Sequence, residues 1–233
     1  YGASGNSWDA ALSAAVVTTN GEPNARSGVR DIGRDSYTLS GKSSVEVVPD
    51  FTLRAVGRYV FTEGQSNDQD FGFGSPTAGL VVDSPGVGFE NEAVSGLVGA
   101  NLVTAGGNWV HDLSIQFTDA ERQNFNGVAV TSDARSDRFK GSYTSSYNFD
   151  DTGHSLTFAA DYELEGFNNA ATFNFRNEAE NVGFVGEYRY AGKRFDFSAA
   201  LRHDINDLFQ DATTFRAGAG FDATDTPRLR AAV

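Results

Sequence analysis

The sequence contains no cysteine and no methionine. Without cysteine, the chain has no disulfide, no thiolate metal site and no cysteine nucleophile. Proline is also scarce, with five in 233 residues. No apolar run approaches the roughly 18 residues of a transmembrane helix, which excludes helical membrane proteins. Because position 1 is not methionine, we expect that further sequence precedes this segment.

Positively charged residues are also few: the sequence has 18 Lys and Arg but 31 Asp and Glu, which gives a net charge of −13. Nucleic-acid binding relies on clustered Lys and Arg that neutralise phosphate, so we expect no nucleic-acid partner. The mean hydropathy of −0.35 would normally indicate a soluble protein. Transmembrane barrels are an exception, because their strands alternate lipid-facing and lumen-facing residues.

Strand-forming residues are abundant, with 19 Phe, 8 Tyr and 26 Gly. Apolar and polar residues alternate with period two, the pattern of a strand with two different faces. Trp109, Leu113 and Phe117, for example, alternate with Asp112 and Gln116, and aromatic residues mark both ends of the run. This pattern recurs and predicts about eleven strands. Several reach about 12 residues, long enough to cross a bilayer, which takes roughly 9–11.

Short and long connections alternate along the chain. Short turns are predicted at 49–50, 105–108, 150–153, 191–193 and 223–227, and longer polar loops at 19–35, 63–88, 119–135, 165–179 and 205–212. Strict alternation predicts that turns and loops lie on opposite sides of a membrane. The predicted fold is therefore all-β, a transmembrane antiparallel up-and-down β-barrel, in one domain over residues 1–233. A soluble β-sandwich with the same aromatic residues in its core remains the alternative.

Two segments resemble TonB-dependent outer-membrane receptors. Residues 39–59 resemble an early barrel hairpin of this family, with the sequence LSGKSSVEVVPDFTLRAVGRY. Residues 188–233 resemble its middle region, where a strand ends in an Arg-x-Asp step, here Arg202-His203-Asp204. The family barrel has about 22 strands around a plug. The resemblance implies a partial barrel, with the plug domain and the C-terminal strands outside this chain.

The resemblance also implies a function. It implies uptake of a ferric siderophore or cobalamin across a Gram-negative outer membrane, with lipid around the barrel and TonB acting through the missing plug. We expect a monomer. The rivals are a passive porin of about 16–18 strands and a soluble carbohydrate-binding or adhesive β-protein.

We expect no enzyme, because no catalytic arrangement is visible. The three histidines lie in separate segments without ligand spacing: His111, His154 and His203. No Ser-His-Asp set or pair of catalytic carboxylates can be assembled from the pattern.

The loop 63–88 holds the first candidate site. Asp68 and Asp70 stand next to Phe71 and Phe73. We predict that this group contacts the ligand, with Phe71 and Phe73 against an apolar face of it; the alternative is that the two phenylalanines pack the loop onto itself. Alternating loop carboxylates could also hold Ca²⁺, although solvated carboxylates without a metal are the alternative, and no other cofactor is expected.

The second candidate site is a set of cations at alternate positions of the predicted strands, which we expect to face the lumen. They would either guide an anionic substrate or pair with carboxylates of the plug or the barrel. The set consists of Lys42, Arg54, Arg58, Arg138, Lys140, Arg202 and Arg216.

Overall fold

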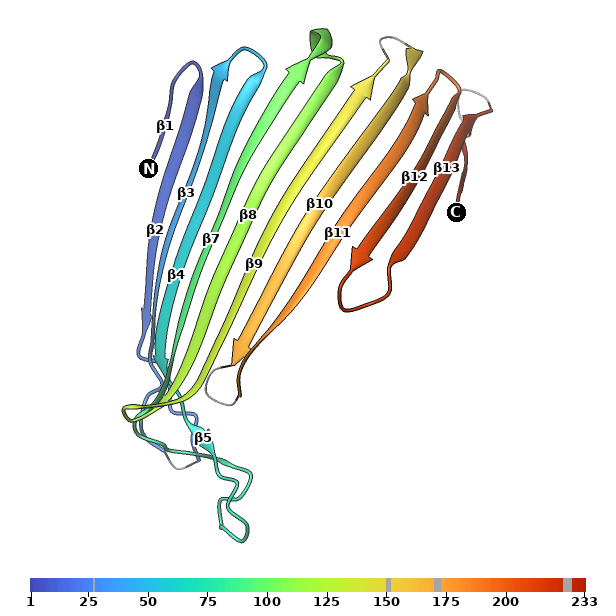
Figure 1. Cartoon of the computed structure of the whole chain (residues 1–233). Helices are drawn as coiled ribbons and strands as arrows, with labels where there is room; N and C mark the ends of the chain where they lie inside the picture. The colour runs from blue at the N-terminus through green and yellow to red at the C-terminus, as the bar shows by residue number, and fades with distance from the viewer. Residues whose placement is uncertain (27, 150–151, 170–172, 224–227) are drawn as a thin grey trace.

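The structure is a computed structural model and describes residues 1–26, 28–149, 152–169, 173–223 and 228–233. Twelve strands form one antiparallel sheet in which successive strands lie side by side, as one curved wall (Figure 1). The sheet does not close, because β1 and β14 form its two edges. Its strands are β1 (Gly2–Ser4), β2 (Trp8–Thr19), β3 (Arg34–Val48), β4 (Phe51–Gln65), β7 (Val87–Thr104), β8 (Trp109–Asn126), β9 (Ala129–Asn148), β10 (His154–Asn169), β11 (Phe173–Ala191), β12 (Phe195–Asn206), β13 (Ala212–Asp222) and β14 (Arg228–Ala232).

Three smaller elements lie outside this sheet. β5 (Asp68–Gln69) and β6 (Val81–Val82) pair with each other in the loop between β4 and β7. The 3₁₀ turn η1 (Ala105–Gly107) joins β7 to β8. In the part of the chain that the structure describes, no helix is long and apolar enough to cross a membrane. The prediction of an all-β antiparallel sheet of about eleven strands in a partial barrel is confirmed.

Two of the predicted long loops are wrong. In the region 119–135, β8 and β9 continue to a turn of only Gly127 and Val128, and the positive φ of that glycine, 61°, suits a tight turn. Strands also occupy most of the region 165–179, of which residues 170–172 lie outside the described range. These segments are largely polar, with a few apolar residues such as Phe125 and Phe167, and a strand paired on both sides needs no apolar residue to complete its backbone ladder.

The remaining connections agree better with the predicted alternation. Loops 20–33, 66–86 and 207–211 lie at one end of the strands, which we call the loop end. The predicted turns 49–50, 105–108 and 191–193 lie at the other, the turn end. The predicted turns 150–153 and 223–227 fall partly outside the described residues.

The sheet is a single layer with two different faces. Among the described hydrophobic residues, only Val87 is buried. On β8, Leu113 and Ile115 are 49% and 47% exposed on one face, whereas Ser114 between them is 5% exposed on the other. Side chains crowd together on the concave side of a curved sheet, so we assign the face of Ser114 as the inner, polar face. The outer face carries the apolar residues.

Candidate functional site

The register places all seven predicted cations on the inner face. Neighbouring residues in a sheet share a face, so a row of paired residues can be followed from strand to strand. One such row runs from Arg54 through Gly99, Ser114, Ser142, Asp161 and Gly183 to Asp204. Each of the other six cations lies an even number of residues along its strand from a residue of this row, or is paired with a residue that does. Its side chain is therefore on the same face.

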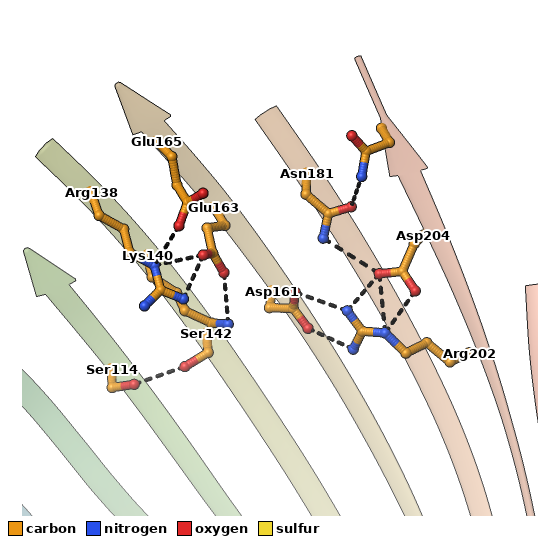
Figure 2. A network of polar contacts seen from close by, with 11 residues as sticks. Ser114, Arg138, Lys140, Ser142, Asp161, Glu163, Glu165, Asn181, Arg202 and Asp204 are labelled. Atoms are coloured by element: carbon orange, nitrogen blue, oxygen red, sulfur yellow. Dashed lines mark hydrogen bonds and ion pairs between the residues drawn. The ribbon is translucent and has the colours of Figure 1, made fainter. Parts of the chain in front are cut away.

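One cluster of inner-face charges centres on Glu163 of β10 (Figure 2). Its two carboxylate oxygens accept hydrogen bonds from different cations, Arg138 Nε at 2.6 Å and Lys140 Nζ at 2.9 Å. The side chain of Glu163 is 17% exposed, and Arg138 also lies 3.3 Å from Glu165. These cations are therefore bound to carboxylates of the sheet itself, as one of the two predicted alternatives required.

A second cluster centres on Arg202 of β12 (Figure 2). Its two terminal nitrogens donate to the two oxygens of Asp161 at 2.9 and 3.2 Å, and its Nε donates to Asp204 at 2.8 Å. Asp161 lies on β10, so this bidentate pair passes over β11. The residue beneath it is Gly183, where an added Cβ would lie 2.3 Å from an Arg202 nitrogen.

The same arrangement occurs twice more. Arg54 of β4 forms a bidentate pair with Asp112 of β8 at 2.7 and 2.8 Å, above Gly99 of β7. On the outer face, Arg176 of β11 pairs with Asp137 of β9 in the same way, above Gly166 of β10. We call these three contacts the arginine bridges. Each joins two strands that are not hydrogen-bonded to each other, and each requires a glycine on the strand between.

The long loops at the loop end are held together by Arg30, which sequence reasoning missed. This arginine lies in loop 20–33, and its side chain reaches across to loop 66–86 and the end of β4. It donates to Asp83 at 2.9 Å, Gln65 at 3.0 Å, the carbonyl oxygens of Ser66 at 2.9 Å and Ser84 at 3.0 Å, and the Asn67 side chain. We call the two loops together the double loop. Its hairpin, which contains β5, extends beyond the strand ends (Figure 1).

The predicted ligand-binding residues lie on this hairpin. Phe71 and Phe73 are 83% and 109% exposed. Asp70 accepts hydrogen bonds from the hydroxyls of Ser75 at 2.5 Å and Thr77 at 2.6 Å, and from a backbone N–H. These donors, the Ser75 hydroxyl first, hold the pKa of Asp70 below its ordinary value of 3.8. Asp68 lies in β5 with an exposed side chain.

The Ca²⁺ site remains a prediction. Within the described ranges, no group of three or more His, Cys, Asp or Glu side chains could hold a metal ion. Both oxygens of Asp70 already accept hydrogen bonds, and Asp83 pairs with Arg30. A metal at either carboxylate would have to displace these donors.

The three histidines are apart from one another on the outer face. Each is hydrogen-bonded to a hydroxyl of a neighbouring strand: His111 to Tyr143 at 2.8 Å, His154 to Tyr188 at 2.6 Å and His203 to Thr213 at 2.8 Å. Each of these histidines therefore has the ordinary environment of a strand residue.

The outer face changes character abruptly toward the loop end. On four strands, an aromatic residue is followed on the same face, two positions nearer the loops, by a carboxylate. The pairs are Tyr37 and Asp35 on β3, Phe61 and Glu63 on β4, Phe117 and Asp119 on β8, and Phe139 and Asp137 on β9. An apolar region therefore ends along one line across the sheet.

The comparisons with known proteins agree on the fold. No family model matches the sequence, and no curated protein matches it. The siderophore receptor PirA from Pseudomonas aeruginosa matches 98% of this chain at 12% identity, with a TM-score of 0.71. The ferripyoverdine receptor of the outer membrane of the same organism matches 97% at 11% identity and 0.59, and the RagAB peptide importer matches 97% at 11% identity and 0.68.

These matches cover 36%, 38% and 35% of the respective solved chains, so this chain spans little more than a third of their length. Identities this low show the fold alone. The chain has the fold of a matching segment of siderophore receptors and of a peptide importer.

Proposed function

We propose that this chain forms part of the barrel wall and loops of an outer-membrane receptor that takes up a ferric siderophore or cobalamin. The observation that carries the proposal is the division of a single-layer sheet into an exposed apolar outer face and an ion-paired inner face. In this assignment, lipid surrounds a monomeric barrel, and TonB supplies energy through a plug that is not part of this chain.

The outer face supports the membrane assignment because neighbouring apolar side chains on it are exposed, such as Leu113 at 49%, Ile115 at 47% and Phe117 at 48%, and contiguous exposed apolar surface marks a protein or membrane contact. The height of the apolar region also fits that of a transmembrane barrel. Trp109 and Phe117 stand eight residues apart on β8, which at about 3.3 Å per residue and a tilt of about 40° gives roughly 20 Å. The apolar band of a transmembrane barrel is about 25 Å tall.

The inner face supports the assignment to a water-filled or plugged lumen. Several of its charged side chains are paired in the clusters around Glu163 and Arg202, which satisfies these groups without a second protein layer. At the loop end, the double loop presents Phe71 and Phe73 toward solvent, where they would meet a bulky ligand with an apolar face. An enzyme is not proposed.

A pair of substitutions on β8 tests the membrane assignment. Leu113 lies midway between Trp109 and Phe117 and is 49% exposed in the structure, so an arginine there would be harmless in water. At the midplane of a bilayer, the same Leu113→Arg change costs about 2–4 kcal/mol. We expect it to prevent insertion of the full-length protein into outer-membrane-like vesicles. Gln116→Arg, on the inner face, is the matched control and should insert normally.

Insertion is measured by the shift in gel mobility that a folded barrel shows before and after heating, and by resistance to protease in vesicles. Equal insertion of the two variants would contradict the membrane assignment, and a detergent-free, monodisperse wild type would contradict it independently.

A further inference from the structure

The outer face contains a groove that the proposed uptake function does not use. Gly41 of β3, Gly57 of β4 and Gly96 of β7 lie next to one another in register. Because three neighbouring strands lack a side chain here, the backbone itself forms the floor of the groove. The groove has a volume of about 670 Å³, within the range of roughly 300–1,000 Å³ typical of ligand sites.

The walls of the groove are largely hydrocarbon, although Tyr1, Ser43 and Tyr59 each carry a hydroxyl group. Leu12 closes one end, with its Cδ1 3.6 Å from the position that a Cβ of Gly41 would take. Phe117 closes the other end, where its ring covers Gly96 so closely that a Cβ there would lie 2.4 Å from it. The remaining outer-face side chains of the lining are Tyr1, Ala3, Ala10, Leu39, Ser43, Ala55, Tyr59, Val94 and Val98.

Gly57 in the middle of the groove is not needed for the backbone. Its φ lies outside the left-handed region, and an added Cβ would meet nothing within 4 Å. Glycine within a strand is unfavourable relative to alanine. The absence of a side chain at this position therefore serves the open space and not the fold of the strand.

The depth of the groove indicates what fills it. Gly57 lies four residues from Phe61, the residue at which the apolar region ends on β4. Four residues correspond to about 13 Å along the strand, or roughly 10 Å along the membrane normal at a tilt of about 40°, and the hydrocarbon of one leaflet is roughly 15 Å thick. The groove is thus continuous with the outer face at the depth of the acyl chains of the loop-side leaflet.

We propose that this groove binds one acyl chain of a lipid from the loop-side leaflet; the inference rests on the membrane assignment made above. No charged side chain is among the outer-face residues of the lining, so a charged ligand would lose its hydration without gaining a partner of opposite charge. A helix of a partner protein is about 10–12 Å in diameter. It is too wide for a floor of three glycines, which spans two interstrand spacings or about 10 Å, is partly covered by the Phe117 ring over Gly96, and is closed at its other end by Leu12. A void left unfilled would forfeit its dispersion contacts, and a flexible chain is the component of the bilayer that fits.

The test compares two substitutions of glycine by leucine on the outer face. Gly57→Leu fills the groove, and the open space around its Cβ predicts that the strand folds normally. Gly141→Leu is the matched control, because an added Cβ at Gly141 also meets nothing within 4 Å and this residue does not line the groove.

The full-length protein and both variants are placed in nanodiscs of palmitoyl-oleoyl phosphatidylcholine that contain the same lipid with a diazirine in one acyl chain. After illumination, the labelled peptides are mapped. We expect labelling of β3 and β4 around the groove to be several-fold stronger than labelling of the rest of the outer face. It should fall to that background in Gly57→Leu and persist in Gly141→Leu.

Uniform labelling of the outer face in the wild type, or unchanged groove labelling in Gly57→Leu, would overturn the inference. Both results would leave the membrane assignment intact, since lipid labelling of the outer face would still be observed. Absence of lipid labelling anywhere, with no heat-dependent gel shift, would instead remove the membrane assignment and the groove together.

Discussion

The arginine bridges make an unusual prediction for Gly183 on β11. Replacing a strand glycine with alanine normally stabilises a protein by roughly 0.5–1 kcal/mol, because glycine loses more conformational freedom on folding. At Gly183, the new Cβ would lie 2.3 Å from a terminal nitrogen of Arg202 and 2.9 Å from an oxygen of Asp161. The guanidinium would have to move, and its bidentate contact with Asp161 would break.

The size of the destabilisation follows from the contact that Arg202 loses, with Asp161, and the one that it keeps, with Asp204. Hydrogen bonds to charged groups contribute about 1.5–3 kcal/mol each, but the Arg202 side chain is 35% exposed and its contact with Asp204 would survive. We therefore expect Gly183→Ala to destabilise the folded barrel by about 1–2 kcal/mol. Gly186→Ala on the same strand is the control, since nothing lies within 4 Å of an added Cβ there, and it should be neutral or stabilising.

The assay is urea unfolding of the full-length protein in lipid vesicles, followed by circular dichroism and gel mobility. A double-mutant cycle isolates the cause. In an Arg202→Met background the bridge no longer exists, so adding Gly183→Ala should cost nothing and should behave as Gly186→Ala does. If Gly183→Ala is as stable as Gly186→Ala in the wild-type background, the proposed role of the glycine beneath the bridge is wrong.

The remaining predictions concern the double loop. Arg30→Ala should open both loops and speed their proteolysis by about tenfold or more, from the loss of contacts worth roughly 1.5–3 kcal/mol; Arg26→Ala, at an exposed arginine of the same loop, should change nothing. The depressed pKa of Asp70 means that its contribution to hairpin order is complete above the ordinary carboxyl value of 3.8 and is lost as pH falls through the lower folded value. The protection factors of the hairpin amides, which are exchange rates corrected for the pH dependence of intrinsic exchange, should fall only in that acidic range, and equal protection at neutral and acidic pH would refute the assignment. The double variant Phe71→Ala, Phe73→Ala should weaken binding of a ferric siderophore or cyanocobalamin by at least about tenfold without shifting the unfolding midpoint; unchanged affinity would remove these residues from the site.

The alternation of residues such as Leu113, Ser114 and Ile115 was enough to predict the strands and their two faces, because membrane strands keep this pattern along their length. It failed beyond the aromatic residues. On β8, the segment after Phe117 is largely polar and was predicted as a loop, although backbone pairing with β9 continues to Asn126.

The side-chain contacts could be predicted only in part. Pairing of the inner-face cations with carboxylates was one expected alternative, but the partners depend on the registers of several strands at once. To predict the bridge between Asp161 and Arg202 over Gly183, the registers of three neighbouring strands must be known. Arg30 carries no signal in the sequence, because its contacts at the end of β4 and in loop 66–86 are made by residues 35–54 positions away.

The connectivity of the large sheet is a line, since each ladder joins strands that follow one another in that sheet. In such an array, stability is approximately a sum of strand terms and nearest-neighbour interfaces. A break in one ladder would divide the wall into two independent parts, and a defect in β3 would reach β12 only through every strand between them. The arginine bridges add a further contribution to this sum, because each couples two strands that are separated by a third. They therefore hold a strand in the sheet when the backbone hydrogen bonds to one of its neighbours open.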